Sequence, residues 1–223
     1  MRREAYRQYG DVRLLNIECS APYGWETKSA THLRVSMPVS YENQAEMARQ
    51  GFFLADRTLG VSINLARSTT DFGSFVRKEP KITGGRQEEV MAIARQSFPT
   101  DRRFHVSPPL DQTLADKILA GWVEALSSYY LYEHREQAVG FLALAGEGDR
   151  RFVHLAAVLE QYRASGAALS LYAAAARDCK AQGVRFLEGR VSAANPAVIN
   201  LYVFLGAKFA EPMDVYLKET YKS

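Results

Sequence analysis

The 223-residue sequence predicts a mixed α/β protein. Segments with strand-like alternation are joined in some places by short turns and in others by amphipathic helices. This combination indicates a mixed sheet that contains both hairpins and helical crossovers. Hydrophobic residues make up 47% and charged residues 24% of the chain, which excludes a collagen, a coiled coil or a disordered chain.

The first third of the chain predicts a small α/β half-domain over residues 1–78. Strands are expected at 12–19, 31–37 and 52–66, with a short helix at 42–50 that Gly51 ends. The stretch from Ser68 to Arg86 is rich in Gly, Ser and Thr, which is typical of a loop. Within it we expect residues 79–86 to act as the linker to a second domain.

The remaining residues, 87–223, predict a larger α/β domain. Apolar residues at helical spacing predict helices at 87–97, 114–126, 167–182 and 196–205. Strands are expected at 128–133, 138–145, 151–159, 184–191 and 215–218.

Charge, cysteine count and hydropathy exclude several function classes. The net charge of +3 falls within residues 1–78, where the basic residues are dispersed, so we expect no nucleic-acid partner. No apolar run approaches the roughly 20 residues of a membrane span. Cys19 and Cys179 are too few and too scattered for a disulfide framework or a metal site, and Cys179 lies among alanines as an inert core residue. We expect a soluble cytoplasmic protein without a metal, for which a homodimer is one possible assembly.

The segment from His154 to Leu169 carries the first chemical signal. A buried strand runs into the short loop Arg163-x-x-Gly166-x-Ala168 and then into an alanine-rich helix. The first amides of a helix lack partners within it, and its dipole favours negative charge. The pattern therefore suits a phosphate or diphosphate cradle, although a plain turn with small residues explains it equally well.

The segment from Ser192 to Phe209 carries the second signal. Asn195 followed by Pro196 is a strong helix start, and Tyr202 lies two turns later on about the same face. Each residue alone suits capping or packing.

Together the two segments resemble the GCN5-related N-acetyltransferase (GNAT) superfamily. Its acyl-CoA loop is matched by Arg163, Gly166 and Ala168, and its following helix by Asn195, Tyr202 and Gly206. The resemblance covers roughly residues 87–223. It implies a central, splayed mixed sheet flanked by helices, and direct acetyl transfer from acetyl-CoA to an amine in a ternary complex.

The resemblance also implies roles for particular residues. The backbones of Ala157 and Val158 would bind the pantetheine and the thioester carbonyl, Asn195 would bind the pantetheine amide, and Tyr202 would protonate the departing sulfur. The diphosphate would lie on the loop formed by Arg163, Ala164, Ser165, Gly166, Ala167 and Ala168.

A finer similarity concerns the acceptor. Arg103-Phe104-His105 and the following residues to Trp122 are similar to a segment of the dTDP-fucosamine acetyltransferases, as is Gly51-Phe52 with Asp56. This similarity implies a small amine acceptor, with a nucleotide-linked amino sugar favoured. Arg103 would meet a phosphate and His105 the amine.

The general base remains open among His105, His154, Glu133 and water. Three other readings of the chain also remain. The acceptor could be an antibiotic, a polyamine or a protein amine, or the chain could be a degenerate acyl-CoA-binding module. Glu188 lies 22 residues after Gly166, which suits a dinucleotide-binding fold, but the loop lacks Gly-x-Gly-x-x-Gly.

Overall fold

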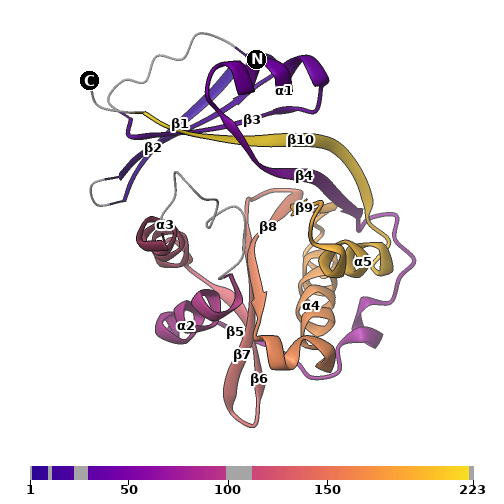
Figure 1. Ribbon diagram of the computed structural model, residues 1–223. Coiled ribbons are helices and arrows are strands. Elements are labelled where there is room, and N and C mark those ends of the chain that lie inside the picture. Colours follow the sequence, from indigo (N-terminus) through magenta and orange to yellow (C-terminus); the bar gives the residue numbers. More distant parts are fainter. Residues whose placement is uncertain (1, 10–11, 23–29, 99–111, 221–223) are drawn as a thin grey trace.

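The computed structural model describes residues 2–9, 12–22, 30–98 and 112–220. These residues form one ten-stranded mixed sheet in the order β1-β2-β3-β10-β4-β9-β8-β7-β6-β5 (Figure 1). The strands are β1 (Arg2–Tyr9), β2 (Val12–Cys19), β3 (His32–Pro38), β4 (Phe53–Asn64), β5 (Lys81–Thr83), β6 (Tyr129–His134), β7 (Gln137–Ala145), β8 (Arg150–Val158), β9 (Phe186–Ser192) and β10 (Lys208–Glu219).

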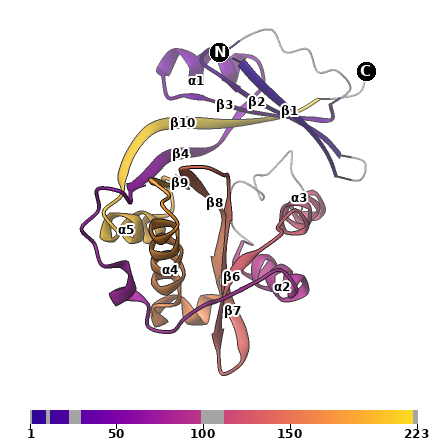
Figure 2. The same cartoon turned by 180° about the vertical axis from the view of Figure 1, so that it is seen from behind.

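Helices cover both faces of the sheet. They are α1 (Tyr41–Arg49), α2 (Gln87–Ser97), α3 (Gln112–Glu124), α4 (Ala167–Ala181) and α5 (Pro196–Phe204), with the 3₁₀ turns η1 (Phe72–Phe75) and η2 (Glu160–Ser165). The view from behind shows α2 and α3 on one side of β6–β8 and α4 with α5 on the other, while α1 covers the N-terminal strands (Figure 2). The main core lies around β6–β9, and a smaller core lies between α1 and the N-terminal strands.

The N-terminal segment contributes a strand to the interior of the sheet. β4 pairs with β9 on one side, where Val61 faces Gly189, and with β10 on the other, where Lys208 faces Ser62. The expected boundary at residues 79–86 therefore coincides with no break in the sheet. Those residues contain β5, which pairs with β6, and Arg86, which precedes α2.

The sequence patterns predicted most helices and strands to within a few residues. The helix over 87–97 is confirmed, and its expected apolar face of Val90, Ile93 and Ala94 is buried. Three strands differ from expectation, and one of them is β5, which lies in the stretch expected to be a linker. β10 extends far beyond the expected 215–218. The sequence did not indicate its first half, because that half is largely polar and exposed. β1 was not expected, since Arg2–Tyr9 lacks apolar alternation and forms an edge of the sheet.

Local capping fixes the ends of the helices near the site. The Asn195 side-chain oxygen accepts a hydrogen bond from the Val198 amide at 3.2 Å, and Pro196 occupies the first turn, as predicted. Gly166 has φ +83°, a left-handed conformation that joins η2 directly to α4. As the N-cap of α4, Gly166 has no side chain with which to cap the first amides.

Candidate active site

The parallel strands β8 and β9 diverge in the middle of the sheet. Their pairing ends at Phe152 opposite Glu188, although β8 continues to Val158 and β9 to Ser192. β8 remains paired with β7, and β9 with β4, on their other edges. Beyond Phe152, one backbone edge of β8 therefore has no partner in the sheet. Backbone groups on such an edge need hydrogen bonds, so the gap suits an extended, amide-containing ligand.

His154 lies where the two strands separate. Ala143 pairs with Leu155 and Leu144 with Val153, so His154 is the extra residue of a β-bulge in β8. A bulge re-aims a side chain relative to the regular alternation of the strand. The imidazole lies beside Trp122 of α3, with ring centroids 6.0 Å apart.

A cavity of about 910 Å³ lies in front of His154, on the side of the sheet that carries α3. The cavity is lined by residues of β1, α3, the segment that follows α3, and the β7–β8 hairpin. Its polar side chains include Arg7, Lys117, Glu124 and His154. Burial, and secondarily the charge of Arg7, lower the pKa of His154 below 6.5. The imidazole is therefore neutral at pH 7 and can accept a proton.

Tyr202 approaches the same region from the other face of the sheet. It is 2% exposed on α5, and its ring forms a T-shaped pair with that of Tyr172 on α4, with centroids 5.3 Å apart. Burial, followed by the interactions with the Tyr172 hydroxyl, raises the pKa of Tyr202 well above its usual value. Tyr202 is therefore a protonated hydroxyl that can donate but does not ionise readily.

Gly189 has no side chain and therefore leaves room for the Tyr202 hydroxyl. A Cβ built at Gly189 would lie 2.8 Å from that hydroxyl oxygen and 3.5 Å from Val61. Gly189 is the first residue of β9 beyond the last pair with β8. The hydroxyl thus lies against β9 at the level where the strands separate, close to the level of His154 on β8.

The predicted acyl-CoA loop lies between β8 and α4. Arg163, Ala164 and Ser165 form the exposed end of η2, and Ala167 with Ala168 begins α4. The structure adds a residue that the sequence did not indicate. Arg77, which follows η1, lies on this loop.

Arg77 is held to the start of α4 by its own backbone. Its amide donates to the buried Ser170 hydroxyl at 3.1 Å, and its Nη1 donates to the Ser165 carbonyl at 3.4 Å. Cδ, Nε and Nη1 of Arg77 would each lie 3.2 Å from a Cβ at Gly166. A guanidinium at a helix N-terminus opposes the helix dipole, so an anion bound there would be stabilised by both.

The other predicted residues have different surroundings. Glu133 is buried and ion-paired with Lys81 at 2.6 Å and with Arg86, and these contacts lower its pKa, so it is a weak base. Burial raises the pKa of the Cys179 thiol to about 11, which suits the inert role expected of it. Arg103 and His105 lie outside the described residues.

The fold and this site define an acyltransferase-like α/β architecture, and residues 88–207 match the Acetyltransferase (GNAT) family. The chain belongs to this family. None of the helices in the described ranges is long and apolar enough to cross a membrane.

Solved structures agree with this assignment at the level of the fold. A GCN5-related N-acetyltransferase from Sphaerobacter thermophilus is 14% identical with a TM-score of 0.60, over 98% of this chain and 76% of its own. A conserved protein of unknown function from Staphylococcus epidermidis is 14% identical with a TM-score of 0.67, over 87% and 75%. A GNAT-family acetyltransferase from Colwellia psychrerythraea is 13% identical with a TM-score of 0.52, over 86% and 66%. No curated protein matches the sequence.

Proposed function

We infer that this protein is an N-acetyltransferase that uses acetyl-CoA and transfers the acetyl group directly to the amine of a small molecule. One observation carries the proposal. A neutral histidine and a protonated tyrosine approach the gap between β8 and β9 from opposite faces of the sheet, at the level where the strands separate. That arrangement supplies a base on the cavity side and an acid on the α5 side.

The described residues fit acetyl-CoA. The diphosphate would lie at the start of α4, whose N-cap residue Gly166 has no side chain, held by the loop Arg163–Ala168 with Arg77 beside it. The pantetheine would bind the unpaired edge of β8, where the backbone of Val158 would polarise the thioester carbonyl, while the backbone groups of Ala157 alternate toward β7. The Asn195 oxygen already caps α5, so its amide nitrogen is the group left for the pantetheine.

A side chain can be assigned to each of the two proton transfers in the reaction. As the new C–N bond forms, the amine gives a proton to His154. As the C–S bond breaks, the Tyr202 hydroxyl protonates the sulfur. A phenol has a pKa of about 10 and a thiol about 8.5, so complete transfer to a free thiolate costs about 2 kcal/mol. Burial of Tyr202 increases that cost, so its proton is transferred as the sulfur departs.

The favoured acceptor is a nucleotide-linked amino sugar bound in the cavity beside His154. The similarity of residues 103–122 to dTDP-fucosamine acetyltransferases supports this choice, and the cavity has a volume suited to a small-molecule ligand. Other amines of similar size remain the second candidate for the same chemistry.

A thiol-release assay with acetyl-CoA tests the proposal, with nucleotide amino sugars, aminoglycosides, polyamines and peptides as acceptors. We expect amine-dependent thiol release that falls at least 100-fold in His154→Ala, since general bases contribute about 10²–10⁴-fold. Glu133→Gln provides the matched control, because Glu133 is engaged in ion pairs. Thiol release that is equal in wild type and His154→Ala would remove His154 as the base.

A further inference from the structure

The three N-terminal strands have one apolar face and one polar face. Leu15, Ile17, Leu33, Val35 and Met37 are buried in the smaller core with Met47 of α1. Strand pairing places the alternate residues together on the opposite face. Those residues are Arg3, Ala5 and Arg7 of β1, Leu14, Asn16 and Glu18 of β2, and His32, Arg34 and Ser36 of β3.

This polar face is turned toward the body of the protein. Leu14 belongs to the main core together with residues of α3, and Arg7 lines the cavity together with α3. A sheet face turned toward the rest of a protein is normally apolar. Here it carries Arg7, whose side chain lines the cavity, so this face contributes a positive charge to the cavity wall.

Helix α3 contributes a second cation to the cavity. Lys117 of α3 lines the cavity, and neither Lys117 nor Arg7 forms an ion pair with another described residue. Glu124 is the one acidic side chain among the described residues that line the cavity. Two cations at the cavity are therefore free to bind an anion.

The residues that line the cavity also indicate where each end of a ligand would lie. His154 and Trp122 lie at the sheet end, next to the gap between β8 and β9. The charge of Arg7 acts on the His154 imidazole and lowers its pKa. When the amine of a ligand lies at His154, an anionic group on the same molecule can therefore interact with the positive charge of Arg7.

We propose that the acceptor is an amine that also carries a phosphate or carboxylate group, and that Arg7 and Lys117 bind this anion in the cavity while the amine lies at His154. The proposal rests on the acetyltransferase function and narrows its substrate class. It also assigns the N-terminal strands a role in substrate recognition, since Arg7 comes from β1.

Matched acceptors test the charge directly. Acetyl-CoA-dependent thiol release would be compared for glucosamine and glucosamine 6-phosphate, for ethanolamine and phosphoethanolamine, and for an amino acid and its amide. We expect kcat/KM to be at least tenfold higher for the anionic member of one or more pairs. The pair that responds distinguishes phosphate from carboxylate as the recognised group.

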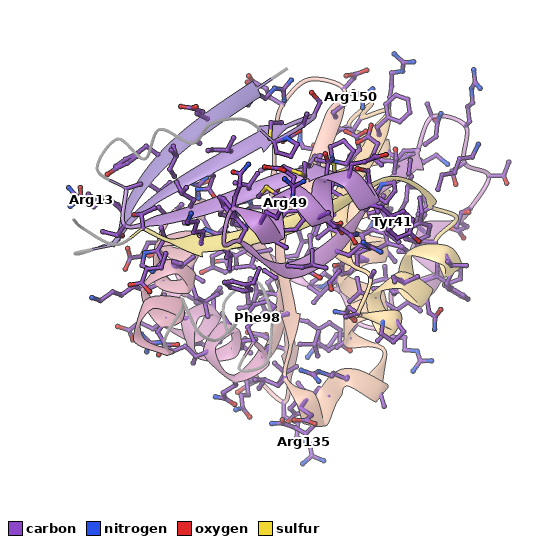
Figure 3. All side chains as sticks on the ribbon, turned by 45° about the horizontal axis from the view of Figure 1, so that its top comes forward. Arg13, Tyr41, Arg49, Phe98, Arg135 and Arg150 are labelled. Atoms are coloured by element: carbon purple, nitrogen blue, oxygen red, sulfur yellow. The ribbon has the colours of Figure 1, made fainter. Side chains whose placement is uncertain are left out.

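Variants of the two cationic residues test where the anionic group of the acceptor binds. Lys117→Gln and Arg7→Gln should each raise the KM of the preferred anionic acceptor at least tenfold and leave that of its neutral partner within twofold. Arg135→Gln is the control, because Arg135 lies on the β6–β7 hairpin at the end of the molecule opposite the N-terminal strands (Figure 3). Added salt should weaken the preference in wild type, since exposed charges are screened.

Pyrophosphate and dTDP provide a second readout that needs no acceptor. With the donor site saturated by CoA, calorimetry should detect binding of at least one of them to wild type and tenfold weaker binding to Lys117→Gln. Equal kcat/KM within every acceptor pair, or anion binding that neither variant changes, would overturn the proposal while leaving the acetyltransferase function intact. Failure of CoA itself to bind would instead overturn the proposed function.

Discussion

The contact between Gly189 and Tyr202 can be tested by a double-mutant cycle. In Gly189→Ala the new Cβ would lie 2.8 Å from the Tyr202 hydroxyl oxygen, a distance that real Cβ atoms do not tolerate. The hydroxyl must therefore move, and both residues lie in the packed interior. Overpacking of this kind costs about 1–3 kcal/mol, which the reduced entropy of the unfolded chain offsets by about 0.4–1 kcal/mol.

Tyr202→Phe removes the atom that causes the overlap. The next neighbours of a Cβ at Gly189 are Val61 at 3.5 Å and the Tyr202 ring carbon at 3.7 Å, both ordinary contacts. In the Tyr202→Phe background, Gly189→Ala should therefore be neutral or stabilising by about 0.4–1 kcal/mol. The coupling free energy should be about 1–3 kcal/mol, the range seen for residues in contact.

Denaturant unfolding of the four proteins measures this coupling, and about 1 kcal/mol would also appear as a melting-temperature difference of about 2–4 °C. Activity provides an independent measurement. Tyr202→Phe should lower kcat by about 10²–10⁴-fold if the hydroxyl protonates the sulfur. Gly189→Ala should lower kcat in wild type and add nothing in Tyr202→Phe. Additive free energies of unfolding would refute the packing, and wild-type turnover in Tyr202→Phe would refute the acid role.

Three further predictions concern the base, the donor site and the N-terminal strands. Burial and the charge of Arg7 lower the pKa of His154, so the acidic limb of the pH profile of kcat/KM should lie below pH 6.5. Arg7→Gln should move this limb to higher pH, and an unmoved limb would exclude an effect of Arg7 on His154. Arg77→Gln should weaken CoA binding about tenfold by calorimetry through loss of a charge-assisted contact, whereas Arg49→Gln on the distant α1 should not, and equal affinities would remove Arg77 from the site. Deletion of residues 1–66 removes β4 from between β9 and β10, so we expect no cooperative unfolding transition; a cooperative transition in the truncated chain would contradict this.

Local sequence patterns predicted the elements, and non-local pairing decided their arrangement. Helix starts such as Asn195-Pro196 and alternating strands such as Val61-Ser-Ile-Asn-Leu65 depend on near neighbours, so they were readable. The insertion of β4 between β9 and β10 brings together residues far apart in the chain. No periodicity encodes such a pairing, so the sequence did not indicate that strands from the first third lie in the same sheet as the rest.

The candidate site shows the same division. The resemblance to the GNAT superfamily indicated Tyr202 and the loop around Gly166, and the structure placed Tyr202 near the gap between the strands. The contributions of Arg77, Arg7 and Tyr172 depend on tertiary packing and left no signal in the sequence. Gly189 did leave one, since an isolated glycine within a strand marks a close approach of another group.

A crystal structure of the complex with acetyl-CoA would show directly whether the donor binds between β8 and β9. We expect the pantetheine in the gap beyond Phe152, the sulfur within hydrogen-bond reach of the Tyr202 hydroxyl, and the diphosphate at Gly166. A complex in which acetyl-CoA lies elsewhere, or in which its sulfur lies away from the gap that Tyr202 and His154 flank, would contradict this expectation.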